Sequence, residues 1–378
     1  MKNNEFLRDI VSHFQHEGTI AGIEPLGNGL INDTFIVRTA EPSAPDYVLQ
    51  RINNAIFTDV PLLQRNIEAV TRHLRSKGEP TLTFIPVKSA GAPSPSSSFG
   101  TDEPDPSAGH GFPVTYHHVT TADTYWRLSV YIPDTVTVND VTPATSYDCG
   151  RSFAHFEALL VDLPETLGET IPDFHNMELR LRQLQEAVRK DSAGRVGQVQ
   201  SILDDLLPYA DEMTKAEQLH RQGLLPKRVC HCDTKVNNML FRNDGTVLCV
   251  IDLDTVMPSF IFSDYGDFLR TAANTVAEDS PDTDKVSFRM DIFEAFTRGY
   301  IEGARPFLTP LEISMLPYAA ALFPYMQCVR FLTDYINGDT YYKIRYPDHN
   351  LVRTRNQQRL FHEVCARQDD MQQFIQKL

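Results

Sequence analysis

One segment of the sequence holds most of the residue types that could carry out chemistry together. It contains His231-x-Asp233-x-x-x-x-Asn238 and, after a turn, an apolar strand that ends at Asp252. Phosphoryl transfer uses one carboxylate to receive the proton of the attacking hydroxyl, and an amide oxygen and a second carboxylate to hold Mg²⁺ against the nucleotide phosphates. Asp233 suits the first task, and Asn238 and Asp252 suit the second. A loop followed by a hairpin can bring these three side chains to one point.

Each of these residues also has an ordinary structural explanation. His-x-Asp at the end of a strand is often a local turn, and Asn238 could cap backbone groups. Asp252 and Asp254 are two apart, so on a regular strand they would share one face, which could simply be solvated. The order and spacing of the whole set favour the catalytic interpretation over these explanations.

The surrounding elements predict a small mixed α and β part followed by a larger helical part. The first part has helical periodicity at 5–17 and 62–76 and strand-like runs at 19–25, 32–38, 47–52 and 125–132. The second part has helical patterning at 144–160, 176–190, 198–222, 288–302, 310–336 and 355–377, and a β insertion at 228–255. Pro317 and Pro324 should kink or split the fifth of these helices. We expect two domains, at residues 1–133 and 134–378.

Composition narrows the class of protein. The chain has 378 residues, of which 42% are hydrophobic and 22% are charged, which is enough for a sizeable core. Its 35 basic and 50 acidic residues give a net charge of −15, which argues against a nucleic-acid partner. The sequence shows no apolar run long enough to span a membrane and no secretory signal at its start. We therefore expect a cytoplasmic protein without a membrane contact.

Two further stretches have a distinctive composition. Residues 89–112 are dominated by Ser, Pro, Gly and Ala, which cannot offset their ordering entropy by burial, so we expect a mobile insertion at a hairpin tip. Cys230 and Cys232 flank His231 and could suggest a metal site. A tetrahedral site needs further ligands, and no other Cys and His cluster in the sequence has suitable spacing. The six scattered cysteines fit reduced thiols instead.

The motifs resemble those of bacterial N-acetylhexosamine 1-kinases, a group within the aminoglycoside phosphotransferase and choline kinase superfamily. The superfamily signature is His-x-Asp-x-x-x-x-Asn followed by Ile-Asp-x-Asp/Glu, which this chain has at 231–238 and 251–254. More specific motifs of the 1-kinases correspond to Gly27-x-Gly29-x-Ile31-Asn32-x-Thr34, Tyr47-x-Leu49-Gln50, Asp264-x-Gly266-Asp267-x-x-Arg270, Arg330-Phe331-Leu332-x-Asp334-Tyr335 and residues 346–355. The resemblance covers most of the chain apart from the insertion.

This resemblance implies a two-lobed protein-kinase-like fold of the α+β class. A small N-terminal β-sheet lobe would bind the nucleotide, and a larger, mainly helical C-terminal lobe would carry out catalysis and bind the substrate. The reaction would transfer phosphate from ATP, with Mg²⁺, to the anomeric hydroxyl of an N-acetylhexosamine such as GlcNAc or GalNAc. Asp233 would be the base, and Asn238 and Asp252 would bind Mg²⁺ with the help of Asp254.

The resemblance also implies which residues bind the two substrates. Arg330 and Tyr341 would contact the sugar. The loop over the ATP phosphates would contain Gly27, Gly29, Asn32 and Thr34, and the backbone of Tyr131 and Ile132 would form hydrogen bonds with adenine.

Two positions depart from the usual kinase pattern. The loop lacks the third glycine of protein kinases and has Asn32 nearby. Gln50 stands on the third strand where kinase-like folds usually carry Lys or Arg, and Glu68 on the following helix is its expected partner. The 1-kinases that the chain resembles also have Gln there. Gln50 fits an ordinary strand residue as well as it fits a phosphate contact.

Other functions remain open at this stage. The acidic net charge would suit a cationic acceptor, so the chain could be a kinase of choline, homoserine or an aminoglycoside. Gln50 motivates a different class, a kinase-like protein that binds nucleotide without turnover. Arg330 and Asp334 could also form only an exposed i, i+4 ion pair on a helix.

Overall fold

The structure is a computed structural model that describes residues 2–27, 31–88 and 115–378. Gly29 of the predicted phosphate loop and the predicted insertion at 89–112 lie outside these residues. The chain divides into two compact units, one of residues 1–71 and 82–133 and the other of residues 72–81 and 134–378. The second unit therefore takes in residues 72–81, which the sequence places in the first domain.

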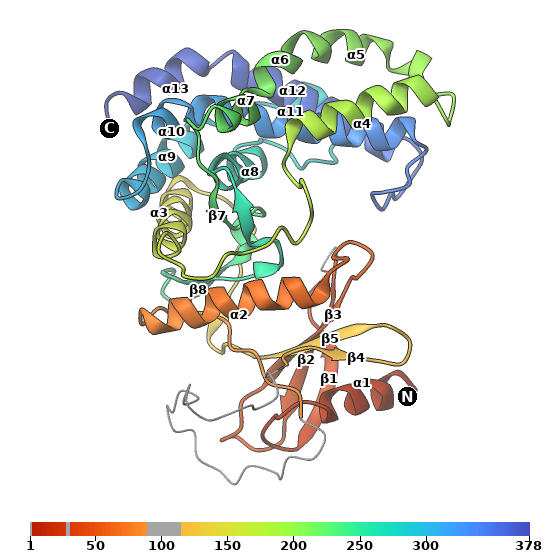
Figure 1. The fold of residues 1–378 in the computed structure, drawn as a ribbon, viewed down its shortest axis with the longest axis vertical. Coiled ribbons are helices and arrows are strands. Elements are labelled where there is room, and N and C mark those ends of the chain that lie inside the picture. Colours follow the sequence, from red (N-terminus) through yellow and green to blue (C-terminus); the bar gives the residue numbers. More distant parts are fainter. Residues whose placement is uncertain (1, 28–30, 89–114) are drawn as a thin grey trace. The chain divides into compact units, whose positions relative to one another are not determined.

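The first unit is built on an antiparallel sheet whose strands run in the order β1-β2-β3-β5-β4 (Figure 1). Its strands are β1 (Ile20–Pro25), β2 (Asp33–Thr39), β3 (Tyr47–Ile52), β4 (His118–Val119) and β5 (Tyr125–Val130), and its helices are α1 (Lys2–Ser12) and the first part of α2 (Val60–Ser76). Leu7, Ile10 and Val11 of α1 pack with Leu49 and Leu128 in the core of this unit.

Strand pairing fixes which side chains share a face of this sheet. Thr34 is opposite Gln50, and Gln50 is opposite Arg127, so these three side chains lie side by side on one face. Their chain neighbours Leu49 and Leu128 point to the other face, which holds the core. The alternation thus leaves a polar row on the face opposite to the core.

The second unit is mainly helical and contains two small sheets. Its longer helices are α3 (Pro143–Leu159), α4 (Met177–Lys190), α8 (Phe262–Ala272), α9 (Met290–Ala304), α11 (Leu316–Ile336), α12 (His349–Cys365) and α13 (Gln368–Ile375). One sheet has the order β6-β8-β9, from β6 (Thr135–Val136), β8 (Met239–Arg242) and β9 (Val247–Val250). The other pairs β7 (Arg228–Cys230) with β10 (Met257–Ser259). The predicted β insertion is therefore two short sheets, and the loop from β7 to β8 joins them (Figure 1).

Three predicted helices are broken in the structure. The stretch at 198–222 forms α5 (Gln200–Leu206), α6 (Ala210–Met213) and α7 (Lys215–Arg221), with a 3₁₀ turn at Pro208 because proline cannot donate a backbone hydrogen bond. The stretch at 310–336 splits into α10 (Pro310–Ser314) and α11, whose first turn contains Pro317, while Pro324 lies inside α11. The last stretch begins earlier than predicted and divides into α12 and α13.

One central helix, α8, has no counterpart among the predicted helices. Nearly all of its residues are buried, including Asp264, Asp267 and Arg270. Phe262, Tyr265, Phe268 and Leu269 recur at helical spacing, so the sequence carries a periodic signal for α8 that the prediction missed.

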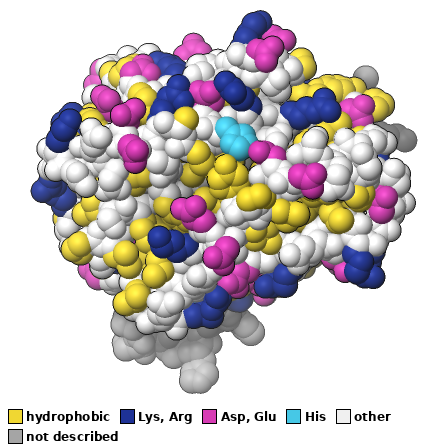
Figure 2. Space-filling view, turned by 90° about the horizontal axis from the view of Figure 1, so that it is seen from above, with side chains coloured by type: hydrophobic (Ala, Val, Ile, Leu, Met, Phe, Trp, Pro, Cys, Tyr) yellow, Lys and Arg dark blue, Asp and Glu magenta, His cyan; other side chains and the backbone are white. Residues whose placement is uncertain are grey.

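The surface in Figure 2 mixes acidic and basic side chains with apolar ones over the face shown. Among the described residues, none of the helices combines the length and the apolar composition that crossing a membrane requires.

Candidate active site

The loop that joins β7 to β8 carries Asp233 and its closest charged partner. Lys235 Nζ lies 2.6 Å from Asp233 Oδ1. Burial is the largest effect and opposes ionisation of Asp233, but the charge and hydrogen bond of Lys235, together with His231 and Asn238, outweigh it and lower the pKa of Asp233. Asp233 in turn raises the pKa of Lys235. Asp233 is therefore a carboxylate at neutral pH, which is the form that can accept a proton.

Asn238 is tied directly to Asp233. Its Nδ2 donates to the backbone oxygen of Asp233 over 2.7 Å and to Oδ2 over 3.2 Å. These bonds fix the amide so that Oδ1 is the atom that a cation would meet. The structure thus brings together the first two residues of the predicted set, and Lys235, which stands inside the same motif, joins them.

The segment from Asp252 to Asp254 lies beyond the end of β9 and is not a regular strand. Asp252 has left-handed backbone angles, φ 59° and ψ 57°, and a 3₁₀ turn follows it. Asp252 is exposed and Asp254 is buried, so the alternative of one solvated face shared by the two carboxylates does not apply. A carboxylate at an abrupt turn can point where a strand residue cannot.

A backbone hydrogen bond brings Asp252 near the first loop. Ile251 N donates to Asn238 O over 2.9 Å, and Met239 pairs with Val250 across the sheet of β8 and β9. Asp252 is the next residue along the chain. The amide oxygen of Asn238 and the carboxylates of Asp252 and Asp254 are hard oxygen donors, which are the ligands that Mg²⁺ prefers, so the residues present fit such an ion.

His231 and Asp264 hold the loop of Asp233 in place. Asp264 of α8 accepts hydrogen bonds from the backbone N–H groups of His231 (2.7 Å) and Cys232 (2.6 Å), and its own backbone oxygen accepts one from Thr234 Oγ1 (2.6 Å). The imidazole of His231 bonds to Ile251 O through Nε2 (2.8 Å) and accepts from the Asp233 N–H through Nδ1 (3.2 Å). His231 thus links Asp233 with the segment that leads to Asp252.

The cysteines beside His231 are packed in an apolar cluster. Cys230 and Cys232 pack with Met257, Ile171 and Phe174. Burial raises the pKa of both thiols well above the usual value. Both side chains are therefore neutral thiols within this apolar cluster.

The motif at 264–270 places α8 against α11. A Cβ atom added to Gly266 would lie 2.5 Å from Ala319 O, so glycine is needed for this close approach of the two helices. Arg270 Nε donates to Asp267 Oδ1 over 2.9 Å, and the charge of Asp267 also favours the cationic form of Lys235. The motif therefore has two effects. Asp267 stabilises the charge of Lys235 in the loop of Asp233, and Gly266 allows α8 to pack closely against α11.

Arg330, which belongs to α11, lies between aromatic rings from other parts of the second unit. Its guanidinium carbon is 5.2 Å from the centre of the Phe174 ring and 5.7 Å from that of Tyr342, and Nη1 donates to Gln327 Oε1 over 3.1 Å. Cation–π contacts of this kind hold a guanidinium in place and leave its remaining donors directed elsewhere.

A second arginine, which the sequence interpretation missed, lies close to Arg330. Burial and then the charge of Arg330 lower the pKa of Arg180 to about 10. Burial, Arg330 and Arg180 lower the pKa of His175, whereas Asp233 acts in the opposite direction. Both arginines and Asp233 therefore lie close enough to His175 to change its pKa, so the three charges lie in the same region of the second unit. No motif marks Arg180, because its part depends on α4 lying near α11.

Asp334 does not serve as an exposed partner of Arg330. Its Oδ1 accepts from the backbone N–H groups of Thr340 (2.9 Å) and Tyr341 (2.8 Å), and its Oδ2 accepts from that of Tyr342 (3.0 Å). Asp334 is 4% exposed, whereas Tyr341 is 58% exposed. A buried carboxylate thus holds the turn that presents the Tyr341 ring.

The residues predicted to contact nucleotide lie in the first unit. Arg127 Nε donates to Gln50 Oε1 over 2.9 Å, and Gln50 Nε2 donates to Thr34 Oγ1 over 3.3 Å. Asn32 Oδ1 accepts from the backbone N–H of Asn53 over 2.9 Å. Gly27 has a φ of 69°, a conformation that favours glycine.

Three other predicted residues lie nearby in the same unit. The backbone N–H of Tyr131 donates to Asp46 O over 2.8 Å, so the carbonyl oxygen of Tyr131 is its group suited to adenine. Ile132 follows β5, and Glu68 lies half-buried on α2.

Solved structures of phosphotransferases share this fold. An aminoglycoside phosphotransferase from Alicyclobacillus acidocaldarius has a TM-score of 0.59 at 11% identity, covering 98% of this chain and 96% of that chain. Amicoumacin kinase hAmiN, in complex with AMP-PNP, Ca²⁺ and Ami, has a TM-score of 0.59 at 11% identity, covering 95% and 93%. Choline kinase LicA from Streptococcus pneumoniae has a TM-score of 0.52 at 13% identity, covering 97% and 100%.

These similarities confirm the predicted fold class, a protein-kinase-like α+β fold with a small antiparallel sheet unit and a larger helical unit. The sequence pattern of the phosphotransferase enzyme family (APH) matches residues 22–307, which is more than half of the chain. The chain belongs to the phosphotransferase enzyme family.

Proposed function

We propose that the protein is an ATP- and Mg²⁺-dependent kinase that phosphorylates the anomeric hydroxyl of an N-acetylhexosamine, GlcNAc or GalNAc. Family membership supports phosphoryl transfer to a hydroxyl. The observation that carries the choice of sugar is the positive charge of Arg330 and Arg180 in the neighbourhood of Asp233.

Asp233 acts as the base in this proposal. Its carboxylate accepts the proton of the sugar hydroxyl while that oxygen bonds to the γ-phosphorus and the bond to the ADP oxygen breaks. A strong base is not needed, since an anomeric hydroxyl is more acidic than an ordinary alcohol and positioning supplies much of the rate. Lys235, bonded to Asp233, places a positive charge where the phosphoryl group gains negative charge.

Asn238, Asp252 and Asp254 are the proposed ligands of Mg²⁺. When bound, the ion neutralises the charge of the nucleotide phosphates. The hydrogen bonds from Asn238 to Asp233 keep the proposed metal ligand and the proposed base in a fixed arrangement.

The two arginines in the neighbourhood of Asp233 favour a neutral, oxygen-rich acceptor over a cationic one. Arg330 has donors that suit hydroxyl and amide carbonyl oxygens, whereas Arg180 donates to Gln183 and to backbone oxygens. The positive charges of both arginines repel a quaternary ammonium or a polyamine. Phe174, Tyr341 and Tyr342 offer ring faces against which a pyranose can lie. The net charge of −15 favours cations over the whole molecule, but two nearby guanidinium groups decide the local potential.

The nucleotide is proposed to bind the first unit. The loop with Gly27, Gly29, Asn32 and Thr34 would cover the phosphates, and Tyr131 and Ile132 would contact adenine through their backbone. Glu68 would lie near the phosphate contact of Gln50. We infer that the cation usually found on the third strand is replaced by Arg127 on β5, because Arg127 is bonded to Gln50 and shares its face of the sheet.

A substrate screen tests the proposed function. The purified chain is incubated with ATP, Mg²⁺ and GlcNAc, GalNAc, glucose, choline, homoserine or kanamycin, and ADP release is followed. We expect release with an N-acetylhexosamine and a phosphorus signal coupled to the anomeric proton of the product. Asp233→Asn, which keeps the shape but removes the proton acceptor, should lower turnover by about 10²–10⁴-fold. Phosphorylation of choline or kanamycin without any hexosamine would show that the sugar proposal is wrong.

A further inference from the structure

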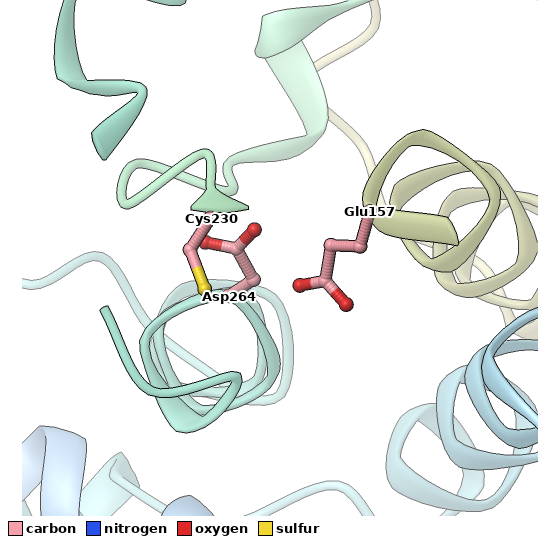
Figure 3. A group of neighbouring side chains, drawn as sticks. All are labelled: Glu157, Cys230 and Asp264. Carbon is pink, nitrogen blue, oxygen red and sulfur yellow. The ribbon is translucent and has the colours of Figure 1, made fainter. Parts of the chain in front are cut away.

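Three buried side chains from three elements meet beside the loop of Asp233. Glu157 comes from α3, Cys230 from the end of β7 and Asp264 from α8, and their functional atoms lie within 4.8 Å of one another (Figure 3). Glu157 is 2% exposed, and the other two are fully buried. Two carboxyl groups in such a place cannot both be ionised at low cost, so the cluster must hold either a proton or a metal ion.

Both carboxylate oxygens of Asp264 accept hydrogen bonds, as expected for the ionised form. One accepts the N–H of His231 and the other accepts the N–H of Cys232. Burial raises the pKa of Asp264, and the opposing effects of His231, of Glu157 and of the two N–H groups offset burial only in part. Hydrogen bonds to both oxygens favour the charged form, so Asp264 is the carboxylate of the pair.

Glu157 has the opposite surroundings. Its Oε2 accepts from the Tyr300 hydroxyl over 2.5 Å, whereas its Oε1 is buried and meets no donor among the residues that the structure describes. Burial, and then the charge of Asp264, raise the pKa of Glu157 well above the usual value of 4.5. Arg228 lowers it but forms its own ion pair with Glu312 at 2.7 Å. A proton on Oε1 would satisfy both carboxyl groups at once.

A metal ion fits the cluster poorly. Both oxygens of Asp264 already accept backbone N–H groups, and Cys230 has a thiol whose pKa is raised well above the usual value by burial and by the two acids. The Sγ of Cys230 donates to Ser259 O at 3.6 Å. A structural zinc site needs four deprotonated or neutral donors directed at one point, and this cluster supplies three.

We propose that Glu157 is kept protonated and donates its proton as a hydrogen bond to Asp264, which makes Glu157 a positioning residue for the loop of Asp233. The one remaining negative charge stays on Asp264 and holds the N–H groups of His231 and Cys232. If Glu157 lost its proton, repulsion would weaken these bonds and displace Asp233. For catalysis this inference rests on the proposed role of Asp233, but the stability test below does not.

The first test follows thermal stability against pH. An acid whose pKa is raised on folding keeps its proton after the unfolded chain has lost it, so the folded state loses stability as pH rises above the ordinary Glu value. Glu157→Gln keeps the donor and cannot titrate. The melting temperature of Glu157→Gln minus that of the wild type should therefore increase steadily from about pH 5 to about pH 8. Tyr147→Phe, which removes a tyrosine hydrogen bond from α3 to Glu302 of α9 and leaves Glu157 untouched, should keep the pH dependence of the wild type.

The second test separates positioning from folding. With the acceptor that the wild type uses, Glu157→Gln should retain turnover within roughly threefold, whereas Glu157→Ala should lose about tenfold or more in kcat with little change in the KM for ATP. The metal content of the purified full chain, measured by mass spectrometry, should show no stoichiometric zinc.

Three results would overturn the inference. They are bound zinc, a Glu157→Gln variant whose melting temperature relative to the wild type does not change with pH, and a Glu157→Ala variant that folds and turns over normally. The stability and metal measurements need no sugar, so a wrong acceptor would leave them interpretable.

Discussion

Gln50 on β3 and Arg127 on β5 face each other across the sheet of the first unit, and Arg127 Nε donates to Gln50 Oε1 over 2.9 Å. The guanidinium carbon also lies 5.5 Å from the centre of the Phe84 ring. The strand that carries a cation in most kinase-like folds has an amide here, and a cation stands directly beside it on the neighbouring strand. The positive charge that is missing at Gln50 is therefore present on its neighbour Arg127, which lies far along the chain.

If Arg127 contacts the phosphates, its removal should weaken phosphate binding but not nucleoside binding. Arg127→Met should lower the affinity for ADP by about ten- to a hundredfold, because one charge-assisted contact is lost, and change that for adenosine little. Titration calorimetry with both ligands measures this difference. Arg127→Lys should recover much of the ADP affinity. Arg51→Met, on the opposite face beside Asp33, is the matched control. Equal losses for ADP and adenosine would assign Arg127 to folding alone.

Asp252 should contribute to nucleotide binding only when a metal ion is present. Asp252→Ala deletes a proposed ligand and should weaken binding of ATP with Mg²⁺ by about ten- to a hundredfold. With EDTA in place of Mg²⁺, the variant and the wild type should bind ATP alike. Asp244→Ala, in the turn between β8 and β9, removes a carboxylate from the same hairpin and should change neither affinity. An unchanged affinity for Mg-ATP in Asp252→Ala would remove this residue from the metal site.

Lys235 should set the acid limb of the pH–rate profile. The rate falls as Asp233 becomes protonated, and the nearby ammonium holds the pKa of Asp233 low against the effect of burial. In Lys235→Met only His231 and Asn238 still oppose burial, so the pKa of Asp233 rises and the acid limb moves to higher pH. Kinetics of kcat/KM against pH show this shift. Lys227→Met, which breaks an ion pair with Glu169 elsewhere, should leave the limb in place. A limb at the same pH in Lys235→Met would mean that Asp233 is not the group that titrates.

Arg330 should govern the acceptor and not the nucleotide. Arg330→Ala removes donors in the neighbourhood of Asp233 and should raise the KM for N-acetylhexosamine by roughly ten- to a hundredfold with little change for ATP. Steady-state kinetics with each substrate varied in turn provide both constants. Arg345→Ala removes an exposed arginine paired with Asp279 and serves as the control. If the KM for the sugar does not change in Arg330→Ala, residues other than Arg330 recognise the acceptor.

The sequence determined those features that depend on neighbours along the chain. Strand-like runs marked β2, β3 and β5, and apolar residues at helical spacing marked α1 and α2, because these patterns are local. Asp233 and Asn238 are five residues apart in one loop, and the structure joins them by direct hydrogen bonds. Chemistry that needs closely spaced side chains can therefore be recognised from spacing alone.

The tertiary structure decided every feature that depends on contacts between distant segments. The polar side of α8 is buried as well as its apolar side, and Asp264 on that polar side holds the loop of Asp233. Arg127 and Arg180 belong to no motif, since their environments come from strand pairing and from the approach of α4 to α11. Asp334 lies one turn after Arg330, which suggests a surface ion pair, but it instead binds the backbone at 340–342. Desolvation and hydrogen-bond geometry select such partners, and both are properties of the folded chain rather than of residue order.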